Sequence, residues 1–237
     1  MIFLLTTIQQ DEPEVEKNDI VEIFKRKYRV FDISVSIGSQ HIDYPGDPEF
    51  KREIILDKTS NPFELSALSM SSHCATHIDF PAHFIKDGKR AGDYKITDFI
   101  MPAHVIEVSG KEIRADHLNQ VNLNPGDAVL FKTQCSQMIE RRKNTIIEDN
   151  PYFDPKLCKY LANSKIKLAA IDYLTPDKFG DNMYAAHNLL LNSGILILEN
   201  INLSGIEIGK YTLFCFGLKI DRAEAVPTRA VIFKEFV

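Results

Sequence analysis

The sequence predicts a single α/β domain with a mixed, largely β core and a few flanking helices. Segments with strand character outnumber helical ones, and while some are separated by a helix, others lie close enough to form hairpins. The 237 residues are 44% hydrophobic and 26% charged, which is typical of a globular protein. We divide the chain into an N-terminal extension, residues 1–28, with one short strand and one helix, and a main domain, residues 29–237.

Short β-branched or apolar runs bounded by turn residues predict the strands of this domain. The pair 50–57 and 64–71 is expected to be antiparallel. The expected strands are 1–8, 29–37, 50–57, 64–71, 103–108, 128–132, 167–171, 195–198, 211–218 and 230–236. Helical spacing of apolar residues predicts helices at 20–27, 155–164 and 183–192, and Gly194 ends the last of them.

Composition argues against several classes of partner. The net charge of -5 argues against nucleic acid binding, and the basic run 141–143 is short and followed by acidic residues. No apolar stretch approaches the roughly twenty residues that a membrane helix needs. The four cysteines are scattered, which is typical of reduced thiols in a cytoplasm. We therefore expect a cytoplasmic protein that binds neither nucleic acid nor membrane.

Potential metal ligands are concentrated in the segment SHCATHIDFPAHF, residues 72–84. Only seven histidines occur in the chain, and three of them lie here with one aspartate. The four residues are His73, His77, Asp79 and His83. A single histidine is more often a hydrogen-bonded core or surface residue, but four polar side chains that converge without a ligand would be costly. Because imidazole and carboxylate are the usual ligands of zinc and similar divalent cations, the segment predicts a metal site.

The spacing of these residues constrains the backbone. A continuous helix is excluded by Pro81. A straight strand would separate His73 from His77 by about 13 Å, which is too far for ligands of one metal ion. We therefore expect a bend at the small residues Cys74 and Ala75.

Beyond the bend, a short extended piece keeps His77 and Asp79 on one side. Pro81 then turns the chain, so that His83 can return to the same cavity. A loop with ligands facing inward suits a catalytic metal site better than a structural zinc site, which favours cysteines.

Two further candidates lie far downstream. His187 is in the last expected helix, and Glu199 ends the apolar strand 195–198. The reversal at Gly194 can bring the two side chains together, and a carboxylate at the end of a buried strand needs a partner. From the residues alone, two interpretations are equally well supported: the pair binds metal, or Glu199 simply contacts water at the sheet edge.

The motif HCATHIDFPAH resembles the H-x-G-T-H-x-D-x-P-x-H pattern of the metal-dependent cyclase family, which contains bacterial-type kynurenine formamidases (arylformamidases) and isatin hydrolases. The resemblance extends from about residue 29 to the end of the chain. The other matching segments are Asp32-Ile33-Ser34, Tyr44-Pro45-Gly46-Asp47-Pro48, Ile171-Asp172, His187-Asn188-Leu189-Leu190 and Ile197-Leu198-Glu199-Asn200.

The resemblance implies a swivelling β/β/α fold, and assembly as a homodimer or homotetramer. It also implies that two zinc ions are held by the positions His73, His77, Asp79, His187 and Glu199. The position of His83 belongs to the catalytic machinery of the family.

Two residues depart from the family pattern. Ala75 stands where the family has glycine, so a positive φ at the bend would be costly. Tyr44 stands where many members have a tryptophan associated with the substrate pocket, and this chain has no tryptophan.

The leading functional hypothesis is hydrolysis of the C–N bond of an N-formyl arylamine, such as N-formylkynurenine in tryptophan degradation. A metal-activated water would attack the carbonyl carbon, and His83 would protonate the leaving nitrogen. One rival is a cyclic amide hydrolase of the isatin type, with a single manganese ion on His73, His77 and Asp79. Another is a non-catalytic metal- or ligand-binding protein on the same scaffold.

Other residues near the motif have two interpretations each. Thr76 is equally well explained as a partner that orients a metal-bound imidazole and as a packing residue. An aromatic wall for the substrate has five candidates, although such residues are more often core. The candidates are Phe63, Phe80, Phe84, Tyr94 and Phe99.

Overall fold

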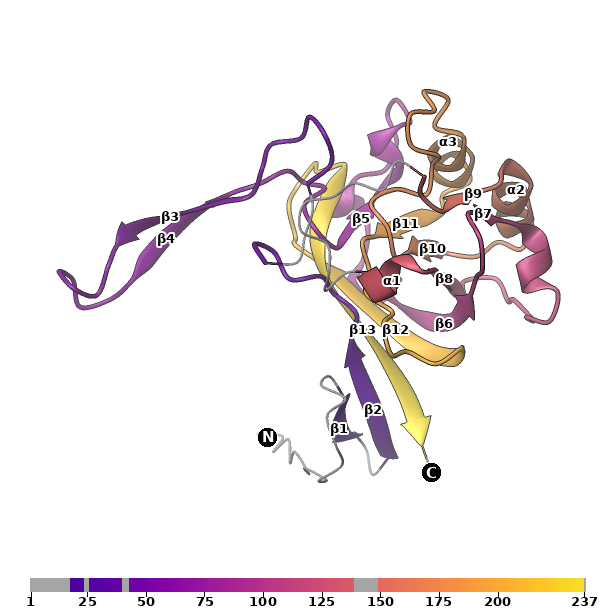
Figure 1. The fold of residues 1–237 in the computed structure, drawn as a ribbon, viewed down its shortest axis with the longest axis horizontal. Helices are drawn as coiled ribbons and strands as arrows, with labels where there is room; N and C mark the ends of the chain where they lie inside the picture. Colours follow the sequence, from indigo (N-terminus) through magenta and orange to yellow (C-terminus); the bar gives the residue numbers. More distant parts are fainter. Residues whose placement is uncertain (1–17, 24–25, 40–42, 139–148, 237) are drawn as a thin grey trace.

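A computed structural model describes residues 18–23, 26–39, 43–138 and 149–236 of the protein (Figure 1). The predicted strand at 1–8 and the basic run at 141–143 lie outside these ranges. Within them, one nine-stranded sheet forms the body of the molecule, and two two-stranded sheets accompany it. This mixed, largely β architecture with a few helices is the predicted fold class.

Seven of the described strands close into a ring. In spatial order they are β13 (Ala225–Phe236), β12 (Gly209–Gly217), β6 (Ile100–Glu107), β8 (Ala128–Lys132), β10 (Leu168–Ile171), β11 (Leu196–Glu199) and β5 (His77–Asp79). Strands β6, β8, β10 and β11 run parallel to one another, and β6 is antiparallel to β12. Strand β5 is antiparallel to both β11 and β13, and it therefore closes the ring.

Side chains alternate between the inside of the ring and its outer face, as the period of a strand requires. Leu168, Leu196 and Leu198 are fully buried in the inner cluster. Ile171 and Ile197 belong to a second buried cluster on the outer face, together with residues from the helices. Each fully buried side chain of this size contributes roughly 1.5–3 kcal/mol, so the parallel strands are stabilised on both faces.

The outer face is covered by α2 (Pro155–Asn163) and α3 (Ala185–Asn192), which lie side by side (Figure 1). Pro155 occupies the first turn of α2, where its missing N–H leaves no hydrogen bond unmade. Helix α3 ends before Gly194, whose φ of +75° lets the chain reverse into β11. Both helices confirm the sequence prediction. A third, short helix, α1 (Cys135–Met138), follows β8.

The helix expected at 20–27 is wrong. The described residues of this range, 20–23 and 26–27, belong to two antiparallel strands, β1 (Asn18–Ile23) and β2 (Arg26–Asp32). Strand β2 in turn pairs with the C-terminal half of β13. Pairing with the edge of β13 therefore favours a strand over a helix in this β-branched segment. The boundary between residues 28 and 29 falls inside β2, and a separate N-terminal extension remains a prediction.

Strands β3 (Lys51–Leu56) and β4 (Leu65–Ser69) form the antiparallel pair that the sequence predicted. This hairpin projects far from the body of the molecule as an arm (Figure 1). The remaining short elements are β7 (Glu112–Ile113), β9 (Tyr152–Phe153) and 3-10 helices at Pro81–His83, Ala91–Asp93, Ile96–Phe99 and Ala115–Leu118. Among the described residues, no helix has both the length and the apolar character to cross a bilayer.

Candidate metal centre

The candidate site lies on the outer face of the ring, where β5 meets β11. In the register of these strands His77 is opposite Glu199, and Asp79 is opposite Ile197. Opposed residues of an antiparallel pair share a face, so His77, Asp79 and Glu199 point away from the inner cluster. All three are buried, and the His77 Nε2 atom lies 3.4 Å from Asp79 Oδ1 and 3.3 Å from Glu199 Oε2.

The bend before β5 occurs where the sequence predicted it. Ala75 has a φ of +56°, a left-handed conformation that costs an L-residue about 1–2 kcal/mol. Two hydrogen bonds hold it: the Ala75 carbonyl pairs with His77 Nδ1 at 2.9 Å, and the Thr228 N–H donates to the Thr76 carbonyl at 2.8 Å. The alanine therefore adopts the positive φ that a glycine would adopt at lower cost.

Thr76 has a role that neither interpretation foresaw. Its hydroxyl donates to the Asn200 carbonyl at 2.6 Å and accepts the Val35 N–H at 2.8 Å. It thus joins three chain segments beneath the site through their backbones.

His187 reaches the same place from α3. Its Nε2 atom lies 3.3 Å from Asp79 Oδ2 and 3.3 Å from Glu199 Oε1. The other ring nitrogen, Nδ1, is 2.5 Å from Asp177 Oδ2, and Asp177 also accepts the Ala186 N–H at 2.7 Å. The structure therefore brings the downstream pair together with the local motif.

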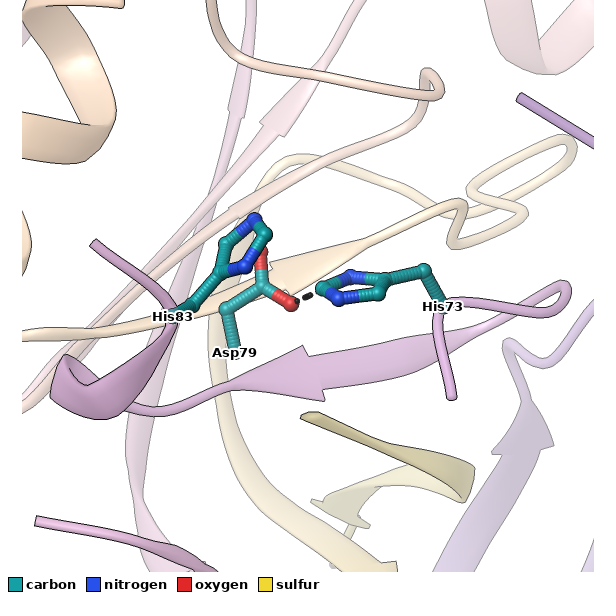
Figure 2. Close-up of side chains that lie close together, drawn as sticks. All are labelled: His73, Asp79 and His83. Carbon is teal, nitrogen blue, oxygen red and sulfur yellow. Dashed lines mark ion pairs between the residues drawn. The ribbon is translucent and has the colours of Figure 1, made fainter. Parts of the chain in front are cut away.

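The rings of His73 and His83 both lie close to the Asp79 carboxylate (Figure 2). His73 comes from the loop before β5, and its Nδ1 lies 3.0 Å from Asp79 Oδ1 and 3.2 Å from His77 Nε2. His83 ends the 3-10 helix that begins at Pro81, and its ring centroid is 4.3 Å from that of His73. The return of His83 to the cavity follows the sequence prediction.

These side chains form two overlapping groups with the spacing of metal ligands. One group is His73, Asp79 and His83, and the other is His77, Asp79 and Glu199, with ligand atoms within 4.8 Å of one another in each. Asp79 belongs to both groups. The position of His83 makes it a potential ligand, as its place in the motif first indicated, whereas the family resemblance assigned it an acid–base role.

Three carboxylate oxygens of the site accept no hydrogen bond from the described residues. Both oxygens of Asp79 and Oε1 of Glu199 are buried and have no hydrogen-bond partner among the described residues. Histidine ring nitrogens lie 3.0–3.4 Å from these oxygens, but a buried carboxylate oxygen that accepts no hydrogen bond is unfavourable. Imidazoles and unsatisfied carboxylate oxygens that converge in this way fit a divalent cation.

The same carboxylates dominate the electrostatics. Burial by itself lowers the pKa of His77, but Asp79 and Glu199 outweigh it and raise that pKa to about 10. Burial opposes ionisation of Asp79, yet His77, His187 and His73 hold its pKa well below the usual value. The centre is therefore a buried focus of negative charge that attracts protons or a cation.

A cavity of about 240 Å³ opens above these residues. Tyr44, Phe84 and Tyr184 form its aromatic walls, and Asp47, Leu174, Thr175 and Asn200 complete the lining beside the candidate ligands. Phe84 stacks on the His187 ring at 4.7 Å. Tyr44 thus lies at the pocket, as its place in the family pattern implied.

Of the five aromatic candidates, only Phe84 lines this cavity. Phe80 and Phe99 belong to the inner cluster, where Tyr94 packs against them. Phe63 lies between β3 and β4 and is exposed. The sequence reasoning missed Tyr184, because nothing in its local pattern places it at the rim.

Two acidic residues around the site were also missed. Asp177 follows β10 by six residues, and its position just after a buried strand was the only available signal. Glu224 lies next to β13, 3.7 Å from His73 Nε2, and no sequence pattern linked it to the motif.

The comparisons with known proteins agree with this architecture. A family model named Cyclase, with the description "Putative cyclase", matches residues 31–178, which is more than half of the chain. The chain belongs to the Cyclase family. This confirms the resemblance that the metal-ligand motif indicated.

Several relatives of known name share this family. Kynurenine formamidase from Bacillus cytotoxicus is 32% identical over 203 residues, which are 85% of this chain and 95% of that protein. Kynurenine formamidase from Bacillus mycoides gives the same identity and coverage. The likeness therefore spans nearly the whole length of these Cyclase proteins.

Solved structures share the fold. An isatin hydrolase bound to the product analogue thioisatinate has a TM-score of 0.77 at 22% identity, covering 88% of this chain and 93% of its own. A potential metal-dependent hydrolase with cyclase activity has a TM-score of 0.75 at 24% identity, covering 89% and 100%. Isatin hydrolase A from Labrenzia aggregata has a TM-score of 0.76 at 21% identity, covering 87% and 93%. These neighbours confirm the predicted fold of the Cyclase family.

Proposed function

We propose that the protein is a metal-dependent hydrolase that cleaves the C–N bond of an N-formyl arylamine. The type reaction converts N-formylkynurenine into kynurenine and formate, a step of tryptophan degradation. The observation that carries this proposal is the convergence of imidazoles and unsatisfied buried carboxylates on the floor of an aromatic cavity. The kynurenine formamidases that are 32% identical over most of the chain support the substrate class.

The metal in this proposal is zinc, as one or two ions, with manganese as the alternative. The residues that would hold it are His73, His77, Asp79, His187 and Glu199. A bound divalent cation supplies Lewis acidity and makes water nucleophilic near neutral pH. The unsatisfied oxygens of Asp79 and Glu199 support this assignment, since a cation would neutralise them.

The protein's own residues prepare the reaction. Asp79 faces His73, His77 and His187 at once and so fixes the centre of the ligand set. The walls of Tyr44, Phe84 and Tyr184 suit an aryl ring, and a ring seated between them excludes water from the reacting carbonyl.

His83 is the proposed acid–base residue. It lines the cavity beside the candidate ligands, and its ring centroid lies 5.5 Å from that of His187. From this position its imidazole can take a proton from the attacking water and deliver it to the leaving nitrogen. Departure of the amine requires this proton, because an anilide anion is a poor leaving group.

A cyclic amide hydrolase of the isatin type is the second candidate. It would use a single manganese ion on His73, His77 and Asp79. The structural similarity to isatin hydrolases, with TM-scores of 0.76 and 0.77, favours it as the alternative. A lactam of an aryl amine resembles an N-formyl arylamine, because both contain an aryl ring and an amide C–N bond that hydrolysis cleaves.

The direct test is hydrolysis by the metal-reconstituted protein. We expect turnover of N-formylkynurenine with zinc, and elemental analysis that finds one or two ions per chain. Faster hydrolysis of isatin with one manganese ion would favour the second candidate. Metal binding without hydrolysis of either substrate would contradict both and leave a non-catalytic binding protein.

Variants separate the roles of the ligands. His187→Ala or Glu199→Ala should lower the metal-to-protein ratio, and an unchanged ratio would contradict their assignment. His83→Ala should keep the metal and lower turnover by at least about a hundredfold. Loss of metal from this variant would instead make His83 a ligand. His117→Ala, which removes a capping histidine outside the cavity, is the matched control.

We also propose that the protein forms a homodimer or homotetramer. The arm of β3 and β4 exposes Ile54, Phe63 and Leu68, and an isolated two-stranded hairpin is at best marginally stable in water. A second subunit that covers the arm would remove this cost. Light scattering coupled to gel filtration should give a multiple of 27.0 kDa, and a monomer would contradict the proposal.

A cytoplasmic location is the last element of the proposal. The cysteines at positions 74, 135, 158 and 215 are all buried and not joined in disulfides, as suits a reducing compartment. Cell fractionation tests this location.

A further inference from the structure

In the candidate ligands His77 and His187, the two imidazole nitrogens contact different groups. One nitrogen of His77 and of His187 faces the carboxylates of the site, and in both residues it is Nε2. The other nitrogen, Nδ1, meets an acceptor outside the ligand set. For His77 this is the Ala75 carbonyl at 2.9 Å, and for His187 it is the Asp177 carboxylate at 2.5 Å. An outer acceptor of this kind fixes the tautomer and the ring orientation of a metal-binding histidine.

His73 has the reverse orientation. Its Nδ1 faces the site, 3.0 Å from Asp79 Oδ1. Its Nε2 points outward, and the nearest acidic group recorded there is Glu224, with Oε1 at 3.7 Å. This ring therefore lies between two carboxylates, one inside the ligand set and one outside it.

The backbone holds Glu224 at this place. It directly precedes β13, whose residue Ala225 pairs with Asp79. The Glu224 carbonyl accepts the Phe80 N–H at 2.9 Å. The same strand contact that positions Asp79 therefore positions the outer carboxylate.

The side chain of Glu224 is also anchored, but not saturated. Its Oε1 accepts the hydroxyl of Ser72 at 2.6 Å, and Ser72 is the residue before His73 in the chain. The carboxylate is about two-thirds buried, with 38% of the side chain exposed. It keeps lone pairs for a second donor, since each carboxylate offers roughly four acceptor positions.

We propose that Glu224 is a positioning residue for His73. It accepts the Nε2–H of His73, and it thereby selects the tautomer whose Nδ1 lone pair faces Asp79. The observed separation of 3.7 Å is longer than a hydrogen bond, so the proposal requires Glu224 Oε1 to move closer to His73 Nε2. The inference rests on the proposed metal site, and it adds to that site a residue outside the ligand set.

The chemistry explains why a carboxylate is suited to this position. A neutral imidazole carries one N–H, which resides on either nitrogen. If His73 carried it on Nδ1, the N–H would point at the metal position and ligation would fail. An ionised acceptor at Nε2 favours the productive tautomer and makes the opposite nitrogen more basic.

The test compares Glu224→Ala with Glu224→Gln in the full-length chain. Zinc affinity is measured by competition with a chromophoric chelator, without any substrate. Loss of an outer partner typically weakens metal binding by about 10–100-fold, and we expect this for the alanine variant. The glutamine variant retains an acceptor oxygen and should recover most of the loss. Glu207→Gln, which alters an exposed carboxylate paired with Lys234, is the matched control and should bind zinc as the native chain does.

A second measurement reads the tautomer directly. Long-range ¹H–¹⁵N spectra of the zinc-loaded protein should show His73 protonated on Nε2, and the Glu224→Ala variant should lose or shift that signal. A zinc affinity for Glu224→Ala within about twofold of the native value, together with an unchanged His73 tautomer, would overturn the proposal.

The two proposals fail in different ways. If the native protein bound no zinc, the proposed metal site would be wrong. The spectra of the metal-free protein would still test Glu224, because an unchanged His73 signal in the alanine variant would refute its role. If the alanine variant did not fold, the glutamine variant and Ser72→Ala, which removes the anchor of Glu224, would provide the same comparison.

Discussion

Replacing Asp177 by asparagine should disable His187 without removing it. Asp177 uses both of its oxygens: one pairs with His187 Nδ1 at 2.5 Å, and the other accepts the Ala186 N–H at 2.7 Å. Asparagine has only one oxygen. If that oxygen keeps the Ala186 N–H, the amide group faces His187 and donates to Nδ1. The imidazole proton then moves to Nε2, which points at Asp79 and Glu199.

The size of the effect follows from this exchange. Changes to the outer partner of a metal-binding histidine cost about 10–100-fold in affinity, equivalent to about 1.4–2.7 kcal/mol. Asp177→Asn turns the ligand nitrogen into a donor, so we expect the upper end, about a hundredfold. Asp177 is buried, but the fold should tolerate the change because asparagine has nearly the same shape as aspartate.

Zinc affinity and the thermal midpoint of the metal-free protein measure the two effects separately. Asp181→Asn is the matched control, because Asp181 lies in the same loop, is exposed, and accepts the Met183 N–H rather than a histidine of the site. We expect weak zinc binding for the first variant and native binding for the second. Equal affinity in both variants would refute the tautomer argument.

Three further outcomes are expected. Asp172→Ala should lower the free energy of unfolding in urea by about 3 kcal/mol, because it leaves buried donors of Thr133 and Ser136 without an acceptor; Asp116→Ala at the exposed surface should cost far less, and equal costs would contradict this account. Removal of metal by a chelator should lower the melting temperature, and zinc should restore it, whereas an unchanged melting curve would argue against a cation between the carboxylates. Burial raises the pKa of three thiols to about 12, so mass spectrometry should find them unmodified by iodoacetamide at pH 8 until urea is added; rapid labelling of the native protein would contradict their burial. These thiols are Cys74, Cys158 and Cys215.

Much of the site could be predicted from the sequence because its ligands are close together in the chain. The distance between His73 and His77 in a strand required a bend, and the positive φ of Ala75 supplies it. The alternation of a short strand placed His77 and Asp79 on one face. Local geometry was therefore sufficient to predict this half of the centre.

The other half depends on contacts between distant segments. His187 and Glu199 remained ambiguous because only the packing of α3 on β11 brings them to Asp79. Asp177 and Glu224 gave no usable signal, since single acidic residues near strand ends are usually solvated. The helix expected at 20–27 was wrong for the same reason, because the edge of a distant strand decides its structure.

The position of β5 in the ring has a consequence for biosynthesis. This three-residue strand has one edge on β11 and the other on β13, and β13 comes far later in the chain than β5. A nascent polypeptide therefore cannot pair the second edge of β5 until residues 225–227 have been synthesised. Premature termination before residue 225 should yield a product that is unable to hold His77 and Asp79 in place, however complete its histidine motif.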